Sequence, residues 1–416
     1  MWTEKSILIC ALGILLIFLA LILKNFSLAT VAVFIFSMLA VSAFSVRKPN
    51  LKLARELSTE KVFEEGSAEI ALYIEGKGVV ELKDELPKVF ALKEGNSCAT
   101  VILESDKRYV LKYAVECPLR GVYTIGPLRT RSEDPFSNFY KEDQLDVFSE
   151  LMVFPKIEEL KEFEVRAVVP RMIPGTIPIK YPGHGLEFFS MRDYVTGDPF
   201  KDINWKVYSR LRKLMVIQRE LETISDITII LDARSVTGTG YINANSLVYS
   251  ARACASITSF FIRRRCNVGL ITYSNTLKTL APGYGERQLY KILCALAEVQ
   301  SNGNIGFSSV ASSLPSIATP QSVIILISSL EEDGSLKEGI KEICDRGFSV
   351  VVLTPSALEL ERRLTAENLE FLRLEREVLL SELKECGAEV IEWSPTAPLA
   401  PILEVMESKW KLRLIR

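Results

Sequence analysis

The chain has 416 residues, 48% of them hydrophobic and 25% charged, and its formal net charge is −2. This length predicts two or three folded units, and the near-neutral charge gives no electrostatic drive toward nucleic acid, so no nucleic-acid partner is expected. A single histidine and eight scattered cysteines without a CxxC pair argue against a histidine-rich metal site and against zinc-spaced cysteines. Scattered cysteines of this kind are typical of a reducing compartment.

The chain begins with two uncharged apolar segments, over residues 6–23 and 26–46. Each is long enough to cross a bilayer core of about 30 Å. The polar break between them, Lys24-Asn25, predicts a transmembrane helical hairpin over residues 1–48. A single cleaved signal peptide is the alternative, which the second apolar segment disfavours.

Basic residues cluster after the second apolar segment, at Arg47, Lys48, Lys52 and Arg55. The positive-inside rule places such a flank in the cytoplasm. The sequence therefore predicts a plasma-membrane protein with two spans, whose partner is the lipid bilayer and whose soluble part is cytoplasmic.

Residues 55–157 show short alternating apolar runs separated by turn residues, as in "SAEIALYIEG" and "RYVLKYAVECP". Alternation with period two and frequent Gly, Pro and Asp predict an all-β, Ig-like antiparallel sandwich. A connector follows over 158–222, and its proline-rich first part, 158–182, predicts an extended linker because proline is excluded from regular helices and central strands.

Residues 223–416 alternate between apolar strands and amphipathic helices. The strands "DITIILDA", "NVGLITYS", "SVIILISS", "SVVVLTPS" and "AEVIEWSP" are continuous apolar runs, which are typical of parallel strands buried on both faces. Helices are expected near 243–264, 286–300, 335–347, 358–386 and 401–409. This order predicts a doubly wound α/β domain with a parallel sheet of about six strands.

Residues 185–205, "GLEFFSMRDYVTGDPFKDINW", resemble the signature of the DUF58 family. The matching positions are Gly185, Glu187, Phe188, Arg192, Tyr194, Gly197, Asp198, Ile203 and Trp205, then Leu214, Val216 and Glu220. Lys201 stands where the family usually has arginine. A second stretch, "RGVYTIGPLRTRSEDPF" over 120–136, is similar to another segment of the family, with Ser137-Asn138 in place of the usual Gly-Leu.

The resemblance implies a C-terminal domain similar to von Willebrand factor A domains. Many members of the family are encoded beside MoxR-type AAA+ ATPases and transglutaminase-like membrane proteins. It therefore implies a membrane-anchored interaction module or assembly factor with an AAA+ ATPase as a protein partner. The family has no established biochemical activity.

An A domain can hold Mg²⁺ through a D-x-S-x-S segment after its first strand and an Asp after its fourth. In this chain Asp232 matches, but Arg234 and Val236 replace the two serines, and Ser329 stands at the second acidic position. A fixed guanidinium repels a cation. We therefore expect no cofactor and a metal-free crevice in which Asp232 pairs with Arg234 or caps a turn. Asp232, Ser235 and Ser329 are the weak candidate ligands for Mg²⁺, with Glu331 or Asp333 as further oxygen donors.

The signature itself is interpreted as a rigid strand–turn–helix with a structural or docking role and no catalytic residue. Gly197 permits a turn with positive φ, and Asp198 before Pro199 predicts a helix N-cap, with Asp202 as the alternative cap. Trp205 and Tyr208 are expected in the core, and Arg192 is expected to bridge a carboxylate across the turn. The docking residues are Glu187, Arg192, Tyr194, Gly197, Asp198, Lys201, Asp202 and Trp205.

A second hypothesis uses the same turn for chemistry. Asp193, Asp198 and Asp202 offer carboxylates for general acid–base or metal-assisted hydrolysis, or for binding a small ligand. The two hypotheses differ in what the carboxylates do. An enzyme needs them convergent and unpaired in a pocket, whereas a scaffold has them capping helices or paired with Arg192, Lys201 or Arg210.

Overall fold

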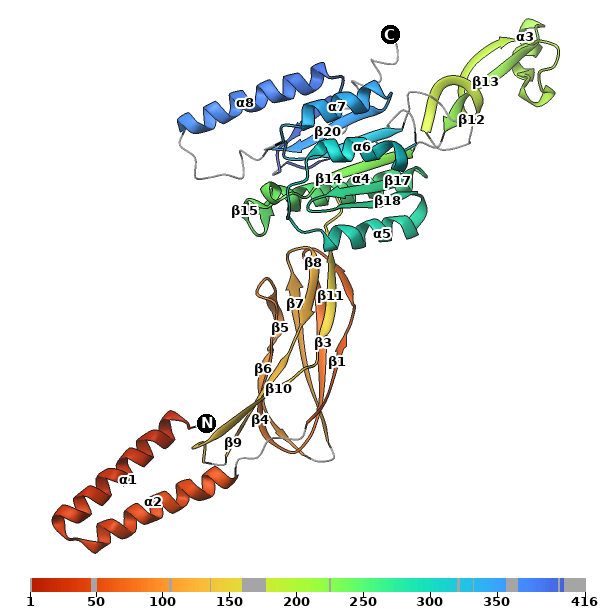
Figure 1. The fold of residues 1–416 in the computed structure, drawn as a ribbon. Coiled ribbons are helices and arrows are strands. Elements are labelled where there is room, and N and C mark those ends of the chain that lie inside the picture. The colour runs from red at the N-terminus through yellow and green to blue at the C-terminus, as the bar shows by residue number, and fades with distance from the viewer. Residues whose placement is uncertain are drawn as a thin grey trace. The chain divides into compact units, whose positions relative to one another are not determined.

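The computed structural model describes residues 2–45, 51–104, 107–134, 136–158, 177–223, 226–319, 322–331, 333–356, 366–395 and 397–399 (Figure 1). For 177–189, 219–223, 366–369 and 371 the description covers the backbone alone. The chain divides into two compact units, residues 1–154 and 155–416.

The first unit begins with the predicted helical hairpin. Helix α1 spans Glu4–Leu23 and helix α2 spans Phe26–Ser45, and the two pack against each other. Thr3 caps α1 by accepting the backbone N–H of Ser6, and Lys24 ends the helix in the left-handed region at φ 48°. Both helices are long and apolar enough to cross a membrane.

The rest of the first unit is a β-sandwich, as predicted. One sheet has the order β1 (Lys52–Leu57), β3 (Gly66–Glu75), β7 (Arg108–Cys117), β5 (Ala91–Gly95). A second has the order β10 (Tyr140–Leu145), β9 (Leu128–Glu133), β4 (Gly78–Asp84), β6 (Cys98–Leu103). A third joins β2 (Lys61–Phe63), β11 (Ser149–Phe154) and β8 (Gly121–Ile125), with β2 and β11 parallel. Alternate residues of the strands, such as Ile70, Leu72 and Ile74 of β3, form the shared core.

Arg55 does not belong to the basic membrane flank. Its guanidinium is buried in the sandwich, where it pairs with Asp84 and donates to the carbonyl oxygens of Ile125 and Val147 at 2.7 and 2.8 Å. Because Arg55 is committed to the core, it adds nothing to the charge at the membrane surface. Arg47 and Lys48, two other members of that flank, lie outside the described residues.

The second unit contains a long hairpin that the sequence did not fully predict. Strand β12 (Ile177–Asp193) pairs antiparallel with β13 (Met215–Thr223). Residues 177–182 are therefore strand and not linker, while 159–176 lie outside the described residues. The sheet has two strands, so both are edge strands, and edge positions tolerate the prolines that a central strand excludes.

The α/β domain is a six-stranded sheet with the order β18-β17-β14-β19-β20-β21. The strands are β14 (Asp226–Asp232), β17 (Asn267–Tyr273), β18 (Leu277–Gly283), β19 (Val323–Ile327), β20 (Ser349–Pro355) and β21 (Glu389–Trp393). All neighbours pair in parallel except β17 with β18. The sheet is therefore mostly parallel, as predicted, with one antiparallel strand, β18, at its edge.

Helices cover both faces of this sheet. The helices are α4 (Ser246–Arg263), α5 (Gly285–Glu298), α6 (Phe307–Ile317), α7 (Leu336–Asp345) and α8 (Ala366–Glu385). Helix α4 contacts β14, β17 and α5, whereas α6 and α7 contact each other and share a core with Ile230, Leu326 and Val352 of the sheet. Helix α6 was not predicted. The expected helix over 401–409 and residues 358–365 of the expected helix 358–386 lie outside the described residues.

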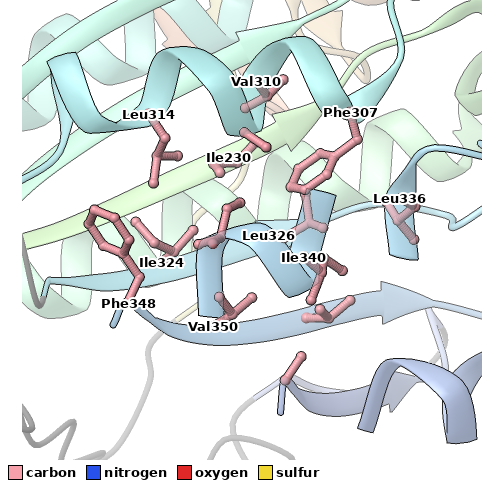
Figure 2. Packing of buried hydrophobic residues seen from close by; sticks show 14 of the residues in the cluster. Ile230, Phe307, Val310, Leu314, Ile324, Leu326, Leu336, Ile340, Phe348 and Val350 are labelled. Carbon is pink, nitrogen blue, oxygen red and sulfur yellow. The ribbon is translucent and has the colours of Figure 1, made fainter. Parts of the chain in front are cut away.

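The core on the α6–α7 side is closely packed (Figure 2). Phe307, Val310 and Leu314 recur at helical spacing on α6 and point toward the sheet. Gly339 of α7 permits the close approach, because a Cβ there would lie 2.7 Å from the ring of Phe307. This packing fixes the start of α6 beside the carboxyl ends of the strands.

Candidate functional site

The first candidate site lies where the strand order of the α/β sheet reverses. Helical crossovers lead in opposite directions from β14, and ligands of open α/β sheets bind at the carboxyl ends of the strands at such a switch point. Asp232 ends β14, and Ser328 and Ser329 follow β19, its neighbour in the sheet. The fold thus brings together the residues that the sequence singled out.

The guanidinium of Arg234 occupies this switch point. Its Nε and Nη2 donate to the two carboxylate oxygens of Asp232 at 3.0 and 2.8 Å, and its Nη1 lies 3.4 Å from Asp333. Nη2 also donates to the carbonyl oxygen of Glu331 at 3.1 Å. The Arg234 side chain is only 1% exposed, so it is fully enclosed by its acceptors.

The carboxylates around Arg234 have further donors. The hydroxyl of Ser328 donates to Asp232 at 2.7 Å. Asp333 accepts the backbone N–H of Phe307, the first residue of α6, at 3.1 Å, where the helix dipole favours negative charge. Burial alone would lower the pKa of Arg234, but the hydrogen bonds and charge of Asp232 raise it, so the guanidinium remains charged.

Tyr273 closes one side of this cluster. Its ring centroid lies 5.7 Å from the Arg234 guanidinium carbon, and its ring packs edge-on against Phe307 at 6.0 Å. Burial, followed by the nearby charge of Asp232, raises the pKa of Tyr273 well above its usual value. The phenol therefore stays neutral and contributes no second anion to the site.

These residues do not fit a resident Mg²⁺. Asp232 is enclosed by Arg234, whose fixed positive charge would oppose a second cation within a few ångströms. The hydroxyl of Ser235 is directed elsewhere, to the carbonyl oxygen of Gly303 at 3.0 Å. The hydroxyl of Ser329 is buried without a hydrogen-bond partner among the described residues, and its neighbour Ser328 is the serine that reaches Asp232. Across the described part of the chain, no three His, Cys, Asp or Glu side chains cluster as metal ligands.

The second candidate site is the tip of the β12–β13 hairpin, which holds most of the signature. Arg192 donates through Nη1 and Nη2 to the two oxygens of Asp198, both at 2.7 Å. Asp198 also accepts the backbone N–H of Val195 at 2.9 Å, and Gly197 between them has φ 113°. The hydrogen bond from Arg192, followed by that from Val195, lowers the pKa of Asp198 below its usual range. The bidentate bridge and the positive φ of Gly197 are thus as expected.

The helix of the signature starts later than expected. A short 3₁₀ turn covers Phe200–Asp202, and helix α3 spans Trp205–Leu211. Asn204 is its N-cap, accepting the backbone N–H of Val207 at 3.1 Å. The predicted caps, Asp198 and Asp202, are therefore wrong: Asp198 is held by Arg192 six residues earlier, a contact between strand and turn that outweighs the local capping pattern.

The apolar residues of the tip are exposed. Trp205 is 57% exposed and Phe200 71%, so the expectation that Trp205 packs in the core is wrong. Its ring instead meets Tyr208 edge-on at 6.1 Å. Only Ile203 and Val216 are buried among the tip's described side chains, since a two-stranded hairpin has little interior to offer. We define the tip surface as the exposed apolar residues Met191, Val195, Phe200, Trp205, Leu211 and Leu214.

The carboxylates of the tip are engaged by different cations. Asp198 pairs with Arg192, while the exposed Asp193 accepts a hydrogen bond from the Lys213 ammonium at 2.7 Å. Asp202 is half-buried in the 3₁₀ turn, and Lys201 is exposed. Tyr194 is half-buried with its ring 6.2 Å from Phe200, and the side chain of Glu187 lies outside the described residues. This arrangement matches a braced scaffold better than a convergent acid–base pair.

Several contributors to both sites were missed in the sequence. Ser328, whose hydroxyl donates to Asp232, and Lys213, which pairs with Asp193, were not singled out. Asp333 was considered only as a ligand for Mg²⁺ and not as a partner of Arg234. The sequence does mark Asp333 as a turn residue, because it begins a D-G-S turn immediately before a helical pattern. Ser328 and Ser329 could not be distinguished, because a one-residue shift at a strand end moves a side chain to the opposite face of the sheet.

Part of the chain is similar to one protein family. Residues 190–356 match the family model described as "Protein of unknown function DUF58". No match was found among curated proteins.

Among solved structures, a CARDB domain from Pyrococcus furiosus is 13% identical, with 25% of this chain and 93% of that chain covered and a TM-score of 0.17. The cupredoxin domain of amoB from Nitrosocaldus yellowstonii is 7% identical, covering 25% and 86%, with a TM-score of 0.18. Proximal thread matrix protein 1 from the mussel byssus is 13% identical, covering 44% and 46%, with a TM-score of 0.29. The region that matches the DUF58 model, residues 190–356, includes the tip of the β12–β13 hairpin and the strands from β14 to β20 around the switch point.

Proposed function

We propose that this chain is a membrane-anchored module that binds a protein partner through the tip surface. The observation that carries this proposal is the exposure of Phe200 and Trp205 on a turn that Arg192 and Asp198 hold rigid. Aromatic residues on a preorganised turn are typical binding hot spots, because little conformational entropy remains to be lost on association.

The charge at the tip indicates the chemistry of the partner. Helix α3 and the turn after it expose Lys206, Arg210, Arg212 and Lys213. Basic residues around an aromatic centre favour a partner whose surface is apolar in the middle and acidic at the rim. The resemblance to DUF58 proteins makes a MoxR-type AAA+ ATPase the first partner to test.

The anchor in this proposal is the α1–α2 hairpin, inserted in the plasma membrane with both of its ends and the soluble domains in the cytoplasm. Most side chains of both helices are exposed, as expected of helices surrounded by lipid. All eight cysteines are free thiols, which suits a reducing compartment. Reporter fusions at the C-terminus test the orientation, with fluorescence expected from a cytoplasmic green fluorescent protein and no activity from alkaline phosphatase.

The docking proposal is tested by site-specific photocrosslinking. A benzophenone amino acid is placed at Phe200 in the full chain, reconstituted in lipid, and incubated with a purified MoxR-type ATPase. The matched control carries the same group at Tyr284, an aromatic residue of the same unit that is 77% exposed and outside the tip. Crosslinking at position 200 and not at 284 is expected, and equal yields would refute docking through the tip.

The Arg192–Asp198 bridge is tested by exchanging its two charges. Arg192→Asp and Asp198→Arg should each weaken binding, because the turn loses its bidentate bridge, and the double exchange should restore part of it. Trp205→Ala should weaken binding by about 2 kcal/mol or more, about 30-fold, if it is a hot spot. The hydrolase hypothesis predicts instead a hydrolytic activity that Asp198→Asn abolishes and the charge exchange does not restore.

A further inference from the structure

One end of the helical hairpin is fastened to the β-sandwich. Because α1 and α2 run in opposite directions, the start of α1 and the end of α2 lie at the same end. The loop between β9 and β10, of which residues 134 and 136–139 are described, meets this end. The backbone N–H and hydroxyl of Thr3 donate to the carbonyl oxygen of Asn138 at 3.1 and 2.9 Å. Trp2 pairs with Phe139 as an isolated β-bridge, with ring centroids 5.0 Å apart.

A buried carboxylate fixes the same loop to α2. Asp134 is 4% exposed and accepts the hydroxyl of Ser42 at 2.7 Å, together with the backbone N–H groups of Asn138 and Phe139 at 2.6 and 2.7 Å. The side-chain amide of Asn138 donates to the oxygen of Ser42 at 3.0 Å. An ionised carboxylate is costly to bury unless hydrogen bonds replace its water. All of these hydrogen bonds of the Asp134 carboxylate come from the loop or from α2, so they join the loop and the helix into one structure.

The depth of this contact places the loop at the level of the bilayer interface. Ser42 lies three residues before Ser45, where α2 ends, which corresponds to about 4.5 Å along the helix axis. The loop therefore overlaps the last turn of an apolar helix. Trp2 and Phe136 are 53% and 49% exposed at this end, and Phe44 of α2 is exposed beside it. Aromatic side chains concentrate where the headgroups of a bilayer meet its acyl chains.

We propose that the β9–β10 loop is itself a lipid-binding surface, in which Phe136, with Trp2 and Phe44, enters the interfacial layer of a phospholipid bilayer. Asp134 and Ser42 are the positioning residues that hold the loop at this depth. The inference rests on the membrane anchoring proposed above and adds that the sandwich contacts lipid directly. The occupant is lipid because the surface is continuous with two helices whose exposed faces are apolar.

The test measures tryptophan quenching by brominated phosphatidylcholine in vesicles containing the full chain. Phe136→Trp is compared with Phe148→Trp in a Trp2→Phe background, so that the remaining tryptophans contribute equally to both. Phe148 is 53% exposed, close to the value for Phe136, but it follows the opposite end of β10, about 20 Å away along a six-residue strand. At least twofold stronger quenching is expected for the tryptophan at position 136.

The outcomes separate the two proposals. Release of the chain from vesicles by alkaline carbonate would refute membrane anchoring itself. Retention in vesicles with equal quenching at positions 136 and 148 would overturn the lipid-binding loop alone, including the case in which another protein covers it. Asp134→Asn, placed in the Phe136→Trp chain, should reduce the quenching while the chain stays in the vesicles. Unchanged quenching would refute the positioning role of Asp134.

Discussion

Replacing Arg234 by methionine should destabilise the α/β domain more than the loss of one surface ion pair. Arg234 and Asp232 are 1% and 0% exposed, so the substitution leaves a buried carboxylate whose remaining donors are the Ser328 hydroxyl and the backbone N–H of residue 234. Removing one partner of a buried pair costs about 3–5 kcal/mol. Replacing both partners removes the uncompensated charge, so Arg234→Met combined with Asp232→Asn should recover about 2 kcal/mol or more.

Hydrogen exchange read by mass spectrometry measures this locally. Peptides covering β14 and β19 should exchange at least about 100-fold faster in Arg234→Met, since 3 kcal/mol corresponds to about two decades in an opening equilibrium. Peptides of β3 and β7 in the sandwich serve as the internal control, because they belong to the other compact unit. Unchanged exchange in the single variant, or a double variant that exchanges faster than the single one, would refute the argument that Arg234 neutralises a buried charge.

Millimolar Mg²⁺ should leave the Tm of the wild type unchanged. Arg234→Ser removes the guanidinium beside Asp232 and should give a Tm that rises with Mg²⁺. A rise in the Tm of the wild type with Mg²⁺ would show that the cation site is open. Phe307→Ala should cost about 3–5 kcal/mol in urea unfolding followed by Trp393 fluorescence, and a loss below 1 kcal/mol would contradict the packing in Figure 2. Burial opposes ionisation of Asp134, but the backbone N–H of Phe139, the Ser42 hydroxyl and further backbone donors outweigh it and lower its pKa. The contribution of the Asp134 carboxylate to holding the loop should therefore be complete above the unfolded pKa of about 3.9. It should be lost only as the pH falls through the lower folded pKa. The quenching at position 136 should follow that profile, and Asp134→Asn should lack it.

The elements that the sequence predicted well are those with an uninterrupted pattern. The two apolar helices, the alternating strands of the sandwich and the continuous apolar strands of the sheet each repeat one period over many residues. Helix α6 also has such a period at Phe307, Val310 and Leu314, but Pro315 and a run of serines obscure it. Strand β18 was missed because an edge strand is half-exposed, and its sequence "LKTLAPG" contains a proline.

The sites were predictable only where partners are close in sequence. Asp232 with Arg234 and Arg192 with a carboxylate of the same turn follow from spacings of two and six residues. The exposure of Trp205 could not be predicted, because burial of a side chain depends on whether a neighbouring layer covers it. A pattern within one segment cannot show that. The contact of Asp134 with Ser42 spans 92 residues, and no pattern within either segment indicates it.

The Arg234 cluster also bears on where such a protein can work. A bound metal ion can be lost to a chelator or displaced by a competing ion, and its occupancy depends on the free concentration in the surrounding compartment. The Arg234 guanidinium belongs to the same chain as Asp232, so every folded copy contains one guanidinium for each Asp232 carboxylate. The charge balance at this switch point is thus set when the chain folds, and it does not depend on whether the ionic composition around the domain is that of the cell interior or of the outside.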